Sequence, residues 1–296
     1  MPGETTPRET TPRTVVVGVD GSEPALRAVD WAADEAARRG LPLRLVYASL
    51  WERYEGAQLT EDLGKPSEQV RAEEVVASAA RRASARRPEV AVSTDVQPEE
   101  PEYALIRESR TASLLVTGTR GRGGLAEALL GSVSLLVAGH AHCPVVVVRG
   151  DAPPAPHHRV VVGVGEEPVT SAAVRFAAEE ARRRGAELEA VRAWRCPAHQ
   201  STDHPLLAGE PARLHEQQAA EVLEKALQEV PDGLAVRRRT VEGQPRTVLV
   251  DASRDADLLV LGARRRQRHF GLQLGRVAHG VLHHSACPVV IVPAQA

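Results

Sequence analysis

The chain is 296 residues long, which is the usual length of two domains. With 43% hydrophobic and 26% charged residues it has the composition of a soluble globular protein, and its formal net charge of −2 provides no attraction for nucleic acid or an anionic membrane. Aromatic residues make up only 3%, too few to assemble a stacking platform for single-stranded nucleic acid. The three cysteines are widely spaced, the chain start lacks the apolar core of a signal peptide, and no apolar run is long enough to cross a bilayer. We therefore expect a cytoplasmic protein.

Strand and helix patterns alternate along the first half of the chain. Residues 1–13 contain Glu-Thr-Thr-Pro-Arg twice, and this polar, proline-bearing tract is expected to be a disordered tail. The β-branched run Thr14–Val19 predicts a strand covered on both faces, and Pro24–Arg39 has the spacing of a helix. The predicted elements that follow are strand Leu43–Ala48, helix Ser67–Arg87, strand Val90–Val96, helix Tyr103–Ser109, strand Ser113–Thr117, helix Ser132–Gly139 and strand Val145–Val148. This alternation predicts a parallel sheet with right-handed crossovers, and the arginines on its helices are interpreted as solvated.

The second half of the chain repeats the first. Residues 15–40 and 160–185 are identical at 14 of 26 positions without a gap. We therefore expect a first domain over residues 14–150, a proline-rich linker over 151–158 and a second domain over 159–296. The strands Val145–Val148 and Val289–Val292 come last in their open sheets, where an exposed edge invites pairing. We predict that these two strands pair antiparallel within the chain and form a pseudo-dimer; a homodimer of chains stays open.

The most informative segment is the glycine-rich stretch that follows the fourth predicted strand. Its glycines let backbone N–H groups approach a phosphate, and the start of the next helix adds free N–H donors and a partial positive charge. Arg120 and Arg122 place cations beside this loop, and Ser132 is expected to cap the helix or to bond a phosphate oxygen.

Three nucleotide motifs compete for this stretch. The P-loop is excluded because the loop has no lysine. The dinucleotide fingerprint matches at Gly121–Ala126, but it follows the fourth strand rather than the first, and no acidic residue stands about 20 residues later, near Ala141. The pattern Gly-x2-Gly-x9-Gly-Ser is met without exception by Gly118, Gly121, Gly131 and Ser132. A glycine-rich crossover that binds no ligand stays an alternative.

This pattern, with its strand context and the duplication, resembles the ATP-binding motif of the universal stress protein family over nearly the whole chain. The resemblance implies an α/β fold of two tandem domains, each a five-stranded parallel sheet of order 3-2-1-4-5 flanked by helices, Rossmann-like and similar to the adenine nucleotide alpha hydrolases. It implies bound ATP, often with a divalent ion such as Mg²⁺ or Mn²⁺ on its phosphates. The implied ATP-binding residues are Val19, Asp20, Ala48, Thr117, Gly118, Thr119, Arg120, Gly121, Arg122, Gly131, Ser132, Val133 and Ser134.

The second half departs from the motif. Gly262 remains, but arginine stands at positions 265 and 276, where the first half has the second glycine and the serine, and Gly165 replaces the aspartate. An arginine side chain obstructs the close approach of backbone to phosphate. We interpret this half as a degenerate partner domain, and its arginine run 264–268 as a solvated loop, with attraction of a polyanion as the alternative.

Histidines and cysteines gather at three places without the spacing of a four-ligand zinc site. These groups are His140, His142 and Cys143; His283, His284 and Cys287; and Cys196, His199 and His204. Cys143 and Cys287 directly precede the last strands, so we interpret them as small buried apolar residues and expect no metal site.

The resemblance implies that ATP in the first domain changes the affinity for an unknown protein partner in stress survival, without catalysis. Hydrolysis needs a group that positions the attacking water, and the loop offers only Glu127. A slow ATPase or an enzyme of the related ATP-pyrophosphatase fold is one alternative, and a flavin-binding electron-transfer module is another.

Overall fold

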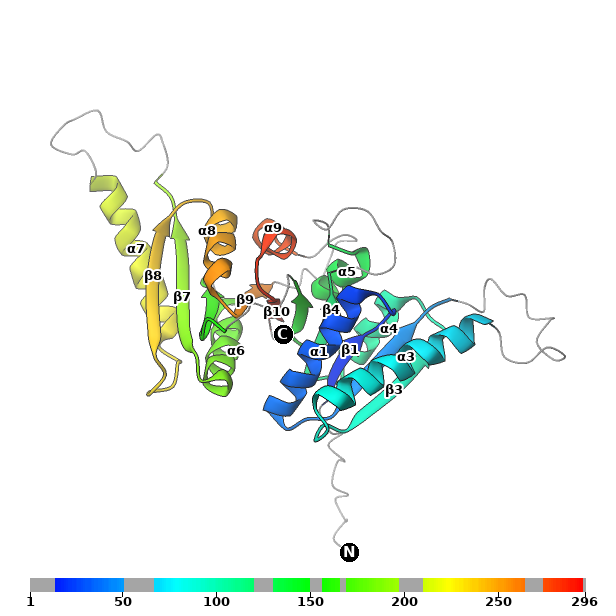
Figure 1. Cartoon of the computed structure of the whole chain (residues 1–296). Coiled ribbons are helices and arrows are strands. Elements are labelled where there is room, and N and C mark those ends of the chain that lie inside the picture. The colour runs from blue at the N-terminus through cyan, green and yellow to red at the C-terminus, as the bar shows by residue number, and fades with distance from the viewer. Residues whose placement is uncertain are drawn as a thin grey trace, which may run out of the picture.

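A computed structural model, shown in Figure 1, describes residues 14–50, 67–119, 130–149, 156–165, 169–196, 210–263 and 274–294. The expected tail and most of the expected linker lie outside these residues. Within the described residues, no helix combines the length and the apolar character that crossing a membrane requires.

The first half alternates strands and helices as predicted. Its strands are β1 (Val15–Gly18), β2 (Leu43–Ala48), β3 (Val92–Gln97), β4 (Leu114–Gly118) and β5 (Val145–Val148). Its described helices are α1 (Glu23–Arg39), α3 (Ser67–Arg86), α4 (Pro101–Glu108) and α5 (Ser132–His140). Helix α4 begins two residues earlier than predicted, because a proline fits the first turn of a helix, where its missing N–H is not needed.

The second half repeats this series. Its strands are β6 (Arg159–Gly163), β7 (Glu187–Trp194), β8 (Val236–Glu242), β9 (Leu258–Ala263) and β10 (Val289–Pro293). Its described helices are α6 (Val169–Arg184), α7 (Glu210–Leu227), α8 (Pro245–Ala252) and α9 (Arg276–His284), with a short 3₁₀ turn, η2 (Ser253–Asp255), after α8.

All ten strands form one sheet in the order β3-β2-β1-β4-β5-β10-β9-β6-β7-β8. Each half therefore has the predicted order 3-2-1-4-5, and the strands within each half run parallel, which confirms the predicted fold. Alternate side chains of a strand point to opposite faces. Val15 and Val17 accordingly pack into the core beneath α1 and α3, whereas Val16 belongs to the core beneath α4 and α5.

The two halves meet at β5 and β10, near the centre of Figure 1. These strands pair antiparallel, with Val146 opposite Val290 and Val147 opposite Val289. The predicted antiparallel pairing of the two last strands is confirmed. The valine side chains of β5 are buried, so neither strand is left as an open edge.

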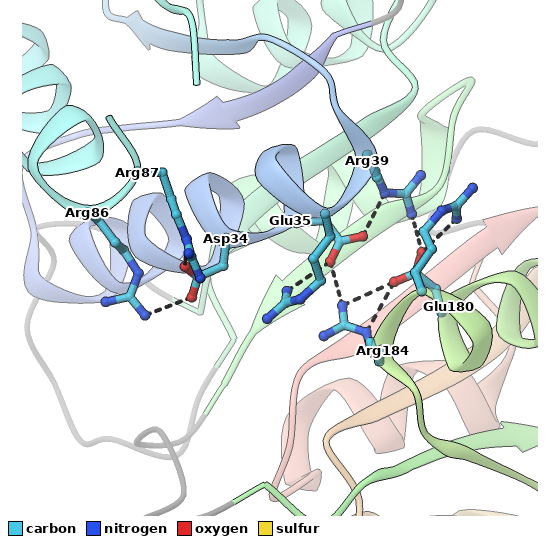
Figure 2. Close-up of polar contacts among 9 residues, drawn as sticks. Asp34, Glu35, Arg39, Arg86, Arg87, Glu180 and Arg184 are labelled. Carbon is cyan, nitrogen blue, oxygen red and sulfur yellow. Dashed lines mark hydrogen bonds and ion pairs between the residues drawn. The ribbon is translucent and has the colours of Figure 1, made fainter. Parts of the chain in front are cut away.

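A second contact between the halves joins the last turns of α1 and α6. The Nε of Arg39 donates to Glu35 in its own helix and its Nη2 donates to Glu180 of α6, both at 2.6 Å. Arg184 reciprocates, because its Nη2 donates to Glu35 at 2.6 Å and to Glu180 at 3.1 Å. Figure 2 shows these four residues, Glu35, Arg39, Glu180 and Arg184, which we call the interdomain cluster.

The interdomain cluster is buried and nearly symmetric. The side chains of Glu35 and Glu180 are 0% and 1% exposed. The guanidinium of Arg39 lies 5.4 Å from the ring centroid of Phe176 on α6, and that of Arg184 lies 5.5 Å from the ring centroid of Trp31 on α1. Both distances are short enough for a cation–π attraction. Burial alone raises the pKa of Glu35, but Arg184 and Arg39 outweigh it and hold this pKa below its ordinary value.

On its other side α1 is bound to α3 by ion pairs. Arg82 binds Asp30 with both Nε and Nη2, at 2.8 and 2.6 Å. Arg86 and Arg87 each bind Asp34 at 2.7 Å. The interpretation of these helix arginines as merely solvated is therefore incomplete, because each holds a carboxylate of the neighbouring helix.

Candidate functional site

The ends of β1 and β4 meet where the order of the strands changes direction. β1 pairs with β2 on one side and with β4 on the other. The chain moves outward from β1 to β3 and then returns to the far side of β1 as β4. In open parallel sheets, ligands bind beyond the carboxyl ends of the strands at such a switch point. Val19 and Asp20 follow β1 here, and Thr117 and Gly118 end β4.

Asp20 organises the start of α1. Its Oδ1 accepts hydrogen bonds from the Ser22 N–H at 2.9 Å and from the Ser22 hydroxyl at 2.6 Å. Ser22 is the N-cap of α1, and its Oγ accepts from the Ala25 N–H at 3.4 Å. The half-buried carboxylate is thus fixed at the end of β1 by the same residue that begins the helix.

Gly118 allows the first turn of α1 to approach the end of β4. A Cβ atom at Gly118 would stand 2.6 Å from the carbonyl oxygen of Pro24 and 3.0 Å from the nitrogen of Ala25. Real Cβ atoms do not come so close to backbone atoms, so any larger residue would push α1 away from β4. Glycine here has a packing reason in addition to its place in the motif.

The hydroxyl of Thr117 is buried beside this contact. Thr117 is 4% exposed, and its Oγ1 has no hydrogen-bond partner among the described residues. A buried polar group without a partner costs about 1–3 kcal/mol, and nearly all such groups in proteins have one. The end of β4 therefore carries a hydroxyl whose hydrogen bonding a ligand would complete.

Helix α5 begins against the same strand end. Its N-cap is Gly131, whose N–H donates to the carbonyl oxygen of Thr119 at 2.5 Å. The buried hydroxyl of Ser134 donates to the carbonyl oxygen of Gly118 at 2.7 Å. Ser132 is the exposed first residue of the helix, and no side-chain hydrogen bond caps it. The expectation that Ser132 caps the helix is wrong, because Gly131 takes the extended conformation of the cap.

The remaining predicted residues are more scattered. Val19 is buried and its N–H donates to Val46 at 2.9 Å, and Ala48 is the half-buried last residue of β2. Val133 packs against the core beneath α4 and α5. Arg120, Gly121 and Arg122 lie outside the described residues, as does Glu127.

In a comparison with known proteins, the sequences of both halves of the chain match the same family. The sequence model of the universal stress protein family matches residues 11–149 and again residues 156–293. The chain belongs to the universal stress protein family. A universal stress protein of Mycobacterium tuberculosis is 33% identical over 94% of this chain and 96% of its own.

Solved structures share the fold. A universal stress protein of Archaeoglobus fulgidus has a TM-score of 0.67 and 18% identity, covering 95% of this chain and 98% of its own. A universal stress protein solved in complex with cAMP is 30% identical and covers 47% of this chain and 97% of its own, with a TM-score of 0.36 over the two-domain chain.

The second domain of this universal stress protein keeps the backbone of the site and replaces its polar side chains. Gly275 is the N-cap of α9 with φ −62° and ψ 154°, close to the −67° and 147° of Gly131. Leu261 stands where the first domain has Thr117, Ala278 where it has Ser134, and Gly165 where it has Asp20. Arg265 lies outside the described residues.

The histidine and cysteine groups form no metal site in the part of the chain that is described. No set of three or more His, Cys, Asp or Glu side chains is placed there to hold a metal ion. Cys143 and Cys287 are buried, and burial raises the pKa of the Cys287 thiol to about 12, so it stays protonated at neutral pH. Cys196 is half-buried, and His199 and His204 lie outside the described residues.

Proposed function

We propose that the first domain of this universal stress protein binds ATP at the ends of β1 and β4, and that the chain acts as a nucleotide-responsive regulator. The buried hydroxyl of Thr117 carries this proposal, because it lies at the carboxyl end of β4 and has no hydrogen-bond partner among the described residues. The second domain has Leu261 at that place and needs no ligand there. One nucleotide per chain follows.

Each part of ATP is assigned to a part of the site. Asp20 contacts the nucleotide, the main chain near Ala48 contacts the adenine, and the segment from Gly121 to Ser134 holds the phosphates. The start of α5 favours phosphate there, since free N–H groups and the helix dipole attract an anion. A divalent ion such as Mg²⁺ or Mn²⁺ would come with the nucleotide and be held by its phosphate oxygens.

A regulatory rather than catalytic role is proposed because hydrolysis requires a group free to orient the attacking water. The loop between Gly118 and Ser132 offers only one acidic residue for this task, Glu127, and Oδ1 of Asp20 is already bonded to the N–H and hydroxyl of Ser22. ATP would instead change the affinity for a protein partner in the cytoplasm. Product analysis after incubation with ATP tests the alternative of a slow ATPase or a pyrophosphatase, and a visible absorption spectrum tests the alternative of a bound flavin.

The decisive experiment replaces Thr117 with valine. Thr117→Val removes an unpartnered buried hydroxyl at constant shape, so we expect the free energy of unfolding to rise by about 1 kcal/mol. The same change should weaken ATP binding about tenfold, because the ligand loses a hydrogen bond. Thr94→Val, at an exposed position of the edge strand β3, is the control. Calorimetry that finds equal ATP affinity for the two variants would contradict the proposal.

The motif itself supplies two further variants. Gly121→Arg gives the first domain the residue of the second and should abolish ATP binding without unfolding the domain. Asp20→Ala removes one polar contact and should cost about 1–3 kcal/mol of binding free energy. Equilibrium dialysis should find one ATP per chain, and two equal sites would refute the assignment of the second domain as degenerate.

A further inference from the structure

Helix α1 connects the candidate site to the second domain. Its N-cap, Ser22, is hydrogen-bonded to Asp20, and its first turn lies against Gly118 at the end of β4. Its last turn carries Arg39, which donates to Glu180 of α6 at 2.6 Å. One element therefore touches the site at its beginning and the neighbouring domain at its end.

The helix is built to move as one body. It runs for 17 residues, with its proline in the first turn and no glycine before its C-cap, Gly40. At about 1.5 Å per residue it spans roughly 25 Å. Its inner face consists of small residues that are wholly buried, and its outer side is fixed to α3 by the ion pairs of Asp30 and Asp34. A displacement of its last turn is therefore carried to its first.

The last turn is held from the second domain by charged groups that are almost completely buried. Glu180 is 1% exposed and receives bonds from Arg39 at 2.6 Å and from Arg184 at 3.1 and 3.2 Å. Arg184 in turn reaches Glu35 at 2.6 Å. If Glu180 is lost, Arg39 and Arg184 are left with Glu35 as their only shared carboxylate. One buried positive charge then stays uncompensated, so the helices must shift to recover hydrogen bonds.

We propose that Glu180 and Arg184 of the second domain are positioning residues for the nucleotide site of the first domain. They fix the axial position of α1, and α1 sets the separation between Asp20 and Ser22 on one side and the end of β4 on the other. The backbones at this point are in close contact, because a single added carbon at Gly118 would already collide with Pro24. The inference rests on the proposed function and assigns to the second domain a role in it without a nucleotide of its own.

The sequence of the second domain agrees with this role. At the strand ends it has Gly165, Leu261 and Ala278 in place of the polar residues of the first domain, yet in the last turn of α6 it has the same glutamate and arginine as α1. A domain that served only to cover β5 would need the apolar strand β10 and not a pair of buried charges on α6.

The test compares two neighbouring glutamates of α6 in the full chain. Glu180→Gln removes a charge from the interdomain cluster, whereas Glu179→Gln makes the same change one residue earlier, on a side chain that is 61% exposed and pairs with Arg183. We expect Glu180→Gln to weaken ATP binding about five- to tenfold, within the usual range of coupling between sites, and Glu179→Gln to leave it unchanged. Arg184→Lys keeps the charge but cannot bridge the carboxylates of Glu35 and Glu180, so it should have an intermediate effect. It is the replacement variant if Glu180→Gln does not fold.

A second readout needs no nucleotide. In the ligand-free protein, the amide hydrogens of Ala25 and Leu26, which bond to Ser22, should exchange faster in Glu180→Gln than in Glu179→Gln. Equal exchange and equal ATP affinity in these two folded variants would overturn the positioning role. If the wild-type chain binds no ATP, the proposed function fails, and the exchange of these two amides still decides whether α6 positions α1.

Discussion

At the end of β4 the first domain has Thr117 and Gly118, and at the equivalent end of β9 the second domain has Leu261 and Gly262. Away from the strand ends some single hydrogen bonds recur in both domains. Ser109 accepts from the N–H of His142, and Ser253, 144 positions later, accepts from the N–H of Ala286. We call the strands and helices that recur in both domains the frame. The comparison shows that the frame can be kept where the polar groups that would touch a ligand are gone.

The largest expected effect comes from separating the two domains. Residues 1–150 alone would expose the edge of β5, which the full chain covers with β10, together with the charges of Glu35 and Arg39. We expect this fragment to dimerise or aggregate, and lysine at Val146 and Val148 to reduce the self-association by placing charge on the edge. Light scattering that shows a stable wild-type monomer would mean that the second domain is not needed as a cover.

Next in size is the loss of a buried partner in the interdomain cluster. Glu35→Ala should lower the free energy of unfolding by about 3–5 kcal/mol, because Arg39 and Arg184 are left with Glu180 as their only shared carboxylate and one buried positive charge stays uncompensated. Asp34→Ala, at the preceding position, breaks only pairs with the more exposed Arg86 and Arg87 and should cost about 1 kcal/mol or less. Urea denaturation of the two variants measures the difference, and equal losses would show that the contact between domains is no stronger than the contact of α1 with α3.

The frame was predictable from the sequence because its signals are local. Continuous β-branched runs predict strands buried on both faces, and β5, a run of four valines, begins and ends where predicted. Strand β2 also has its predicted bounds. Strand β3 lies at the sheet edge, where exposed Ser93 and Thr94 weaken the apolar pattern, and its predicted bounds, Val90–Val96, miss by up to two residues. The start of α4 differs from the prediction because a proline, which breaks a helix in its interior, fits the first turn.

The contacts that complete the candidate site were less predictable, because they join residues far apart in the chain. Glycine spacing identifies Gly118 and Gly131, but nothing local indicates that Ser134 donates to Gly118 or that Thr117 lacks a partner. The interdomain cluster was missed for the same reason. A glutamate four residues before an arginine predicts only a pair on one helix surface. The one available signal was the recurrence of that pair at the same place in both halves.

The smallest expected effect tests whether equivalent helix ends in the two domains contribute equally to the free energy of unfolding. Gly40 ends α1 with φ 62° and Gly185 ends α6 with φ 59°, and at each position an added Cβ would meet nothing within 4 Å. Only the left-handed backbone conformation therefore disfavours a larger residue. Alanine at either position should lower the free energy of unfolding by about 1–2 kcal/mol.

The two losses should also be equal, because φ and the empty space around each glycine are the same. Thermal or urea denaturation of Gly40→Ala and Gly185→Ala measures them, and Gly233→Ala, with φ 86° and nothing within 4 Å in the turn before β8, is a control outside the interdomain contact. A clearly larger loss of unfolding free energy for Gly40→Ala than for Gly185→Ala would show that the end of α1 contributes more to stability than the end of α6. The interdomain cluster would then hold α1 more tightly than it holds α6. The frames of the two domains would in that case differ as well as their polar sites.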